Sequence, residues 1–189
     1  MLRDPEPVLR DLDLVIRTPR LVLRPFRDAD VDDLWPWVSD PALPRMMSWT
    51  AHVDREETAA FVRGRAQALA DNVGLSWAIE HDGRAAGCIA LDGIEWRLRA
   101  LRVDRAELGY WLAPPLWNKW LMTEAARAVV RFAFETVGLH KLTVSCFVEN
   151  DGSRRVIEKC GFRLIGRVED DLHRDGRWWS QLKYELLAR

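Results

Sequence analysis

Residues 117–125 read Trp-Asn-Lys-Trp-Leu-Met-Thr-Glu-Ala, and this stretch lies where a predicted strand passes into a predicted helix. The residues before it, Glu-Leu-Gly-Tyr-Trp-Leu at 107–112, are typical of a strand, and Ala113-Pro114-Pro115 ends that strand because proline cannot continue a ladder. From Thr123 the apolar residues change to helical spacing, at Ala126, Val129, Val130, Ala133 and Phe134. With Gly138 as a suitable stop, the sequence predicts a strand, a short loop and a helix.

The loop between that strand and that helix predicts an anion site of unusual composition. Unpaired backbone N–H groups and the positive end of the helix dipole meet at a helix N-terminus. Loops that hold phosphate in this way normally carry glycine, which lets phosphate oxygens approach the backbone closely. None occurs between Gly109 and Gly138. We therefore expect Trp120 and Met122 either to fill the groove or to turn away and distort the loop, and the anion site to be weak or lost.

Two further segments accompany this loop. One is Thr18-Pro19-Arg20-Leu-Val-Leu-Arg24-Pro25-Phe26; the other is Glu149-Asn150, followed by Ser153-Arg-Arg-Val-Ile-Glu-Lys-Cys-Gly-Phe162. Together the three resemble the GNAT N-acyltransferase superfamily, specifically its RimJ/RimL branch, which acetylates ribosomal-protein N-termini and many small amines. The loop of that branch usually reads Trp-Gly-Lys-Gly-Tyr-Ala-Thr-Glu-Ala. This chain keeps Trp117, Lys119, Thr123, Glu124 and Ala125, but has Asn118, Trp120 and Met122 in place of Gly, Gly and Ala.

The resemblance implies an α/β (α+β) fold of the GNAT type. In that fold, helices flank a mixed, mostly antiparallel central sheet of about 6–7 strands with a V-shaped split, and the pattern of the residues agrees. The strands predicted from the sequence are 14–26, 75–80, 85–91, one or two within 94–112, 141–148, 163–169 and 178–187. The predicted helices are 28–38, 55–70 and 153–159, besides the one from Thr123. We expect residues 1–13 to form a loose N-terminal arm and residues 14–189 a single acyltransferase domain.

The resemblance also implies the chemistry, which is direct transfer of an acyl group from a thioester to a neutral amine. It places Glu107 where relatives keep a carboxylate that draws the amine proton away, and Ser153 where relatives use a general acid. The residues also permit an ion pair for Glu107 and an N-cap role for Ser153. Asn150 matches an asparagine that binds the pantetheine arm, or it closes an Asx turn. The residues expected to bind the donor are Leu112, Lys119, Trp120, Leu121, Met122, Thr123 and Asn150.

The acceptor site is sought among the ten tryptophans. Tryptophan buries a large area with only one donor to satisfy, so we expect some of these rings to line a pocket, with core packing as the alternative for each. The loops at 39–54 and 168–178 are the predicted acceptor loops. The acceptor itself is expected to be a primary amine of a small molecule or of a peptide N-terminus. The candidate substrate-binding residues are Trp35, Trp49, Trp96 and Trp179.

Composition narrows the class of protein. The chain has 189 residues, 48% apolar and 30% charged, which is typical of a globular protein. A net charge of −1 gives no global field for nucleic acid or membrane, and no apolar run reaches membrane length. Three cysteines (Cys88, Cys146 and Cys160) lack metal-ligand or redox spacing, so we expect reduced thiols and no metal. These features favour a cytoplasmic protein, either a monomer or a homodimer.

Two enzymatic hypotheses remain open. The first is an acetyl-CoA-dependent N-acetyltransferase, with acetyl-CoA in doubt because of the loop. The second is the same fold with another donor, such as an aminoacyl-tRNA, for which the phosphate loop is free to drift. A run of arginines would then contact RNA phosphates, although a solvated strand face is the plainer interpretation; these are Arg97, Arg99, Arg102 and Arg105. A non-catalytic binding module would leave the joint presence of Glu107, Asn150 and Ser153 unexplained.

Overall fold

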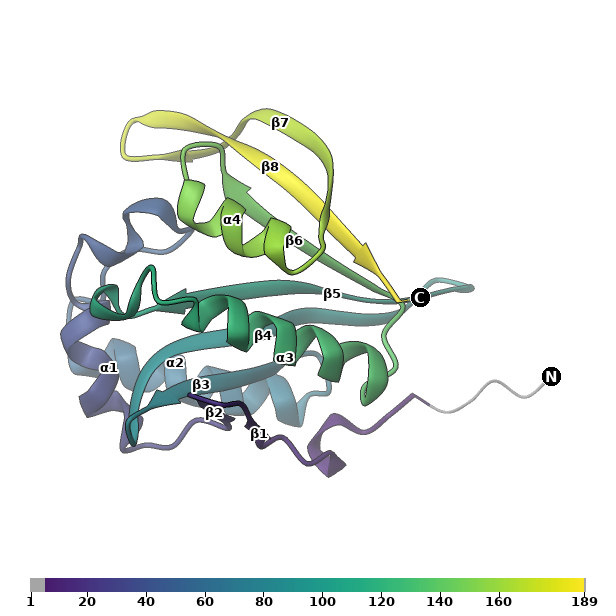
Figure 1. Cartoon of the computed structure of the whole chain (residues 1–189), viewed down its shortest axis with the longest axis horizontal. Helices are drawn as coiled ribbons and strands as arrows, with labels where there is room; N and C mark the ends of the chain where they lie inside the picture. The colour runs from purple at the N-terminus through teal and green to yellow at the C-terminus, as the bar shows by residue number, and fades with distance from the viewer. Residues whose placement is uncertain (1–5, 189) are drawn as a thin grey trace.

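The computed structural model describes residues 6–188, in which eight strands form one sheet. The strand order is β1-β2-β3-β4-β5-β6-β8-β7, and every neighbouring pair is antiparallel except β5 with β6 (Figure 1). The strands are β1 (Ile16–Arg17), β2 (Val22–Arg24), β3 (Leu75–His81), β4 (Arg84–Leu98), β5 (Leu101–Leu112), β6 (Lys141–Phe147), β7 (Arg163–Arg174) and β8 (Arg177–Leu187). The helices are α1 (Asp30–Val38), α2 (Arg55–Ala70), α3 (Leu121–Glu135) and α4 (Asp151–Lys159).

Helices cover both faces of the sheet, with α3 and α4 on one face and α1 and α2 on the other (Figure 1). The central strand β4 is therefore buried on both sides, which explains its nearly continuous apolar run. Its residues alternate between two cores: Ile89 and Leu91 pack with α3, and Cys88 and Ala90 pack with α1 and α2. No helix among residues 6–188 is long and apolar enough to cross a membrane.

The helix α3 follows from its sequence periodicity. Its buried residues recur every three or four positions, so one stripe of the helix packs on the sheet while charged residues face outward. The members of that stripe include Leu121, Ala125, Ala126, Val129 and Ala133. Gly138, at φ 79°, follows the helix in the left-handed region that favours glycine, and the chain then enters β6.

The sheet opens between β5 and β6. These two parallel strands pair only at Arg105 with Lys141, Ala106 with Leu142 and Glu107 with Thr143. Beyond Glu107, strand β6 remains paired with β8 through Phe147 and moves away from β5 (Figure 1). The expected V-shaped split is therefore present, and Glu107 lies at its vertex.

The structure confirms the predicted fold class and differs from the sequence prediction in detail. The predicted strand 14–26 is two short strands, because the Thr18 N–H donates to the Leu21 carbonyl (2.9 Å) and turns the chain. This raises the strand count to eight, where about 6–7 were expected. The helix α3 begins at Leu121 instead of Thr123. The predicted acceptor loop 168–178 is largely a β-hairpin, because β7 continues to Arg174.

Part of the N-terminal segment packs on the domain through Leu9. Leu9 is fully buried in the core beside α3, within a short 3-10 turn at Leu9–Asp11. Its N–H donates to the side-chain oxygen of Asn72 at 2.7 Å. Residues 6–13 thus pack on the domain, while residues 1–5 of the expected arm lie outside the described residues.

Candidate active site

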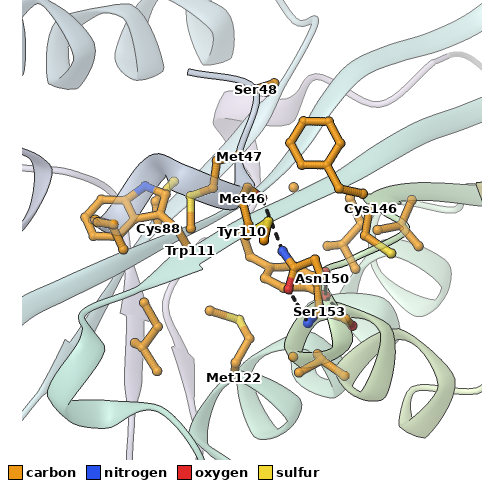
Figure 2. Close-up of a pocket in the computed structure, with 18 of the residues that line it drawn as sticks. Met46, Met47, Ser48, Cys88, Tyr110, Trp111, Met122, Cys146, Asn150 and Ser153 are labelled. Carbon is orange, nitrogen blue, oxygen red and sulfur yellow. Dashed lines mark hydrogen bonds between the residues drawn. The ribbon is translucent and has the colours of Figure 1, made fainter. Parts of the chain in front are cut away.

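A cavity of about 1330 Å³ occupies the split. It is lined on one side by β5, α3 and α4, and on the other by residues 42–49 and α2 (Figure 2). A pocket for one drug-sized ligand holds roughly 300–1,000 Å³, so this cavity is large enough for two reactants that meet inside it. Its polar side chains include Glu107 and Ser153, and the split brings these two sequence-predicted candidates into one space.

Glu107 projects into this cavity from the last residue pair before β5 and β6 separate. Its carboxylate accepts a hydrogen bond from the Ser145 hydroxyl at 3.3 Å. Among the described residues, no basic side chain forms an ion pair with it; the adjacent Arg105 pairs with Glu95. Within residues 6–188 this carboxylate thus faces the cavity without a compensating cation.

Asn150 caps α4, and this leaves Ser153 free for another partner. The Asn150 side-chain oxygen accepts from the Ser153 N–H at 3.0 Å, and its amide donates to the Met46 carbonyl at 3.1 Å. The alternative N-cap role for Ser153 therefore belongs to Asn150. Figure 2 shows Asn150 and Ser153 together beside Tyr110.

Tyr110 is a site residue that the sequence analysis did not select. Its phenolic oxygen lies 3.0 Å from the Ser153 hydroxyl and also donates to the Ser153 carbonyl at 3.2 Å. Burial raises the pKa of Tyr110 well above its usual value, so the phenol stays protonated at neutral pH. The alternation of side chains along a strand could have indicated this position. Tyr110 is three residues from Glu107, so it faces the opposite side of β5, where α4 packs.

The loop that lacks glycine still adopts the backbone angles that glycine favours. Asn118 has φ 60° and Trp120 has φ 65°, both in the left-handed region. Asparagine tolerates this region, but a tryptophan there costs about 1–2 kcal/mol. The Trp120 side chain is 59% exposed, and the Lys159 ammonium lies 3.4 Å from its ring centroid. The Trp120 ring thus turns outward, whereas Met122 is buried and lines the cavity.

The start of α3 forms one wall of the cavity. Leu121, Met122 and Thr123 line it, together with Leu112 from the end of β5, whereas Lys119 is exposed and outside the lining. In this stretch of described residues no side chain caps the helix, so its first N–H groups are available to an anion.

The wall formed by residues 46–61 is aromatic and sulfur-rich. Trp49 lies 5.7 Å from the His52 ring and 6.1 Å from the Trp111 ring, measured between centroids. Phe61 extends this group, at 6.1 Å from His52. Burial lowers the pKa of His52 and outweighs the opposing effect of the Glu57 charge, so the ring is neutral at pH 7. Met46 and Met47 complete the wall.

The other three candidate tryptophans lie outside the cavity lining. Trp35 packs with the α1–α2 core and has the Arg55 guanidinium 5.7 Å from its ring. Trp96 is buried in the opposite core, and Trp179 stacks on Phe147 with 5.0 Å between centroids. Trp49 is therefore the candidate acceptor tryptophan that the structure brings to the site.

Three of the four arginines at 97–105 form ion pairs on their own chain. The partners are Glu6 for Arg97, Asp104 for Arg102 and Glu95 for Arg105. These contacts neutralise most of the positive charge on this hairpin, which favours the interpretation as a solvated strand face.

A sheet that splits beside an uncapped helix N-terminus is the architecture of an N-acyltransferase. A family model described as an acetyltransferase (GNAT) domain matches residues 20–163, and the chain belongs to this family. YdaF of Bacillus subtilis, described as a candidate ribosomal N-acetyltransferase, is 33% identical over 121 residues, which cover 64% of this chain and 63% of that protein. YoaA of the same species, described as an uncharacterized N-acetyltransferase, is 23% identical and covers 92% of this chain and 96% of that protein.

Solved structures agree on the fold. RimL, an α-N-acetyltransferase of ribosomal protein L7/L12 in complex with coenzyme A, superposes with a TM-score of 0.83 at 21% identity, covering 92% of this chain and 97% of that chain. The self-immunity acetyltransferase MccE, in complex with acetyl-CoA and AMP, gives a TM-score of 0.81 at 19% identity and covers 90% and 93% of the two chains. Mycobacterium smegmatis RimJ in complex with a CoA disulfide gives 0.78 at 23% identity, covering 89% and 82%.

Proposed function

We propose that this protein transfers an acetyl group from acetyl-CoA to the primary amine of a small molecule or a peptide N-terminus. The observation that carries this proposal is the hydrogen bond between Ser153 and Tyr110 in the split. Glu107 faces the same cavity, and no basic side chain among the described residues pairs with its carboxylate. That arrangement supplies a proton donor on one side of the reacting centre and a proton acceptor on the other. The CoA complexes of RimL and RimJ support the choice of donor.

In the proposed reaction the neutral amine attacks the thioester carbonyl carbon, and a carbon–nitrogen bond forms. Glu107 draws away the proton that the amine loses, directly or through water. The tetrahedral intermediate then releases the thiolate as the carbon–sulfur bond breaks. Ser153 gives that sulfur its proton, and the neutral phenol of Tyr110 passes its own proton to the serine oxygen as it regains one from solvent, so that no tyrosinate is left. The cavity's main contribution is to hold both reactants in the geometry of attack.

The donor fits the α3 and α4 side of the cavity. The pyrophosphate would lie at the N-terminus of α3, where Leu121, Met122 and Thr123 contribute helix-start N–H groups. Asn150 would face the pantetheine arm from the start of α4, although its side chain already has two partners in the protein. Trp120 and Lys159 would flank the mouth at which the nucleotide end emerges.

The acceptor is proposed to carry an apolar or aromatic group next to its amine. The wall formed by Met46, Met47, Trp49 and Phe61 offers contact area to such a group, and Glu107 offers the charge that attracts an ammonium. The three other carboxylates in the lining pair with arginines: Asp92 with Arg65 at 2.6 Å, Asp151 with Arg154 at 2.8 Å and Glu149 with Arg177 at 3.3 Å. A single uncompensated carboxylate beside an apolar wall suits a hydrophobic monoamine better than a diamine.

The test is an acetyl-transfer assay with purified protein, acetyl-CoA and two amines of similar basicity, phenylethylamine and ethanolamine. We expect CoA release with both and about a 10-fold or larger advantage in kcat/KM for phenylethylamine, as a buried apolar group contributes. An advantage for ethanolamine would contradict the acceptor assignment. Activity that requires charged tRNA and disappears with ribonuclease would contradict the donor and favour the aminoacyl-tRNA alternative.

A further inference from the structure

The loop before α3 (residues 117–120), which we call the donor loop, contains two residues with left-handed backbone angles, Asn118 and Trp120, and neither is glycine. Such a conformation persists only where the surrounding structure enforces it. A constraint on this loop comes from the N-terminal part of the chain. Arg20, in the turn between β1 and β2, donates from one terminal nitrogen to the Lys119 carbonyl at 2.9 Å. It donates from Nε to the Glu124 carboxylate at 2.7 Å. One guanidinium thus joins the loop to the first turn of α3.

The Glu124 carboxylate organises this contact. Its other oxygen accepts from the Thr18 hydroxyl at 2.7 Å and from the Arg20 N–H at 3.0 Å. Its side chain is 17% exposed. Burial alone would raise the pKa of Glu124, but the hydrogen bonds from Thr18 and Arg20 outweigh it and lower the pKa. The carboxylate is therefore ionised at neutral pH and holds the guanidinium in a fixed orientation.

The contact fixes one particular peptide plane. The Lys119 carbonyl and the Trp120 N–H belong to the same trans peptide, so they point in opposite directions. With the carbonyl held by Arg20, the Trp120 N–H must point away from Arg20. Arg20 and Glu124 are outside the cavity lining, whereas Trp120 and Leu121 belong to it.

We propose that Arg20 and Glu124 are positioning residues that hold the glycine-free donor loop in its anion-binding conformation. This inference rests on the proposed function, because it assigns the loop to the pyrophosphate of the donor. Together the two side chains form a clasp (Arg20 and Glu124) that joins the loop to the first turn of α3. Two contacts assist it: the Trp117 indole donates to the Leu112 carbonyl at 2.6 Å, and Lys159 stacks on Trp120.

The test compares steady-state kinetics and direct CoA binding by calorimetry for the full-length protein and its variants. Arg20→Ala and Glu124→Gln should raise KM for acetyl-CoA and the dissociation constant of CoA about 10-fold, with kcat and KM for the amine within about twofold. Arg63→Ala is the matched control, because it removes an arginine whose ion pair with Glu56 lies on the surface of α2. It should leave all four quantities unchanged.

A second set of variants separates the backbone effect from general stability. Glycine adopts the left-handed region without cost, so Trp120→Gly should restore CoA affinity to the Arg20→Ala protein. Trp120→Ala removes the same indole but keeps a Cβ, so it should not restore affinity. Equal behaviour of the glycine and alanine variants would overturn the clasp, as would an Arg20→Ala protein that loses kcat while keeping its CoA affinity.

The outcomes distinguish the clasp from the function on which it rests. If the wild-type protein binds CoA and Arg20→Ala weakens that binding, but the wild-type protein transfers no acetyl group, the clasp is supported and the proposed function is contradicted. If the wild-type protein transfers acetyl groups and Arg20→Ala leaves the CoA affinity unchanged, the proposed function is supported and the clasp is contradicted. A wild-type protein without measurable CoA binding would overturn both.

Discussion

The phenolic oxygen of Tyr110 lies 3.0 Å from the hydroxyl of Ser153, so a side chain of strand β5 and a side chain of helix α4 share a hydrogen bond. Because Asn150 caps the helix, the Ser153 hydroxyl is not needed as an N-cap for α4. The pair is therefore free to serve the reaction, and replacing either member should affect rate more than stability.

Replacing Ser153 by alanine should lower kcat by about 10² with little change in melting temperature, because it removes the proposed acid and leaves the helix cap intact. Asn150→Ala is the informative comparison. It removes the cap and should reduce the free energy of unfolding by about 1 kcal/mol. A Ser153→Ala protein that melts earlier but turns over normally would assign the serine to structure alone.

Tyr110→Phe should lower kcat by about 10-fold, since the ring and its packing remain while the proton source and the hydrogen bond to the Ser153 carbonyl are lost. The two hydroxyls act in one relay, so their effects should not add. The double variant Tyr110→Phe/Ser153→Ala should be about as slow as Ser153→Ala alone. Full multiplication of the two single effects would show that the hydroxyls act independently.

Glu107→Gln should reduce the rate chiefly at low pH, where fewer amine molecules are neutral and removal of the proton matters most. The pH profile of kcat/KM for the amine measures this. Ser145→Ala, which removes the hydroxyl that donates to Glu107, provides a milder control. A loss that is uniform across pH would argue that Glu107 binds the amine without accepting its proton.

The Glu124 carboxylate should make stability depend on acid pH. Because its pKa is lower in the folded protein than the ordinary 4.5, the folded state is favoured when the group is ionised. Its contribution is complete above the ordinary value and is lost as pH falls through the lowered pKa. Urea unfolding of wild type and Glu124→Gln should therefore differ at pH 7 and converge in acid. A constant gap across that range would contradict this assignment.

The local elements and the family of this fold could be predicted from sequence, because they depend on contacts near in the chain or on continuous motifs. The strand–loop–helix at 107–135 follows from a change of hydrophobic period, and the closeness of Asn150 and Ser153 follows from three residues of separation. Four tryptophans could not be sorted in this way. Whether Trp49 or Trp96 faces a cavity is decided by packing between distant segments, which a period does not encode.

The clasp shows the same limit more sharply. Glycine's absence from the loop was readable, and it suggested a damaged anion site. The compensation was not readable, because Arg20 reaches Glu124 across 104 positions of sequence. The left-handed backbone of residues 118–120, unusual without glycine, is thus held by a contact from the turn between the first two strands. Only the three-dimensional structure shows that these two segments meet.

Alanine should give the more stable protein at position 64, whereas glycine should give the more stable protein at position 120. Gly64 lies in the interior of α2 with open space where a Cβ would stand, so Gly64→Ala should stabilise the protein by about 0.5–1 kcal/mol. At position 120 the backbone is left-handed, so the Trp120→Gly protein should be more stable than the Trp120→Ala protein by about 1 kcal/mol. Urea unfolding of the four proteins measures both differences. Since both position-120 variants lose the stack on Lys159 equally, only the backbone distinguishes them. Higher stability of the alanine variant at both positions would mean that residue 120 does not hold its left-handed conformation in solution, and the argument that the loop needs an external constraint would fail with it.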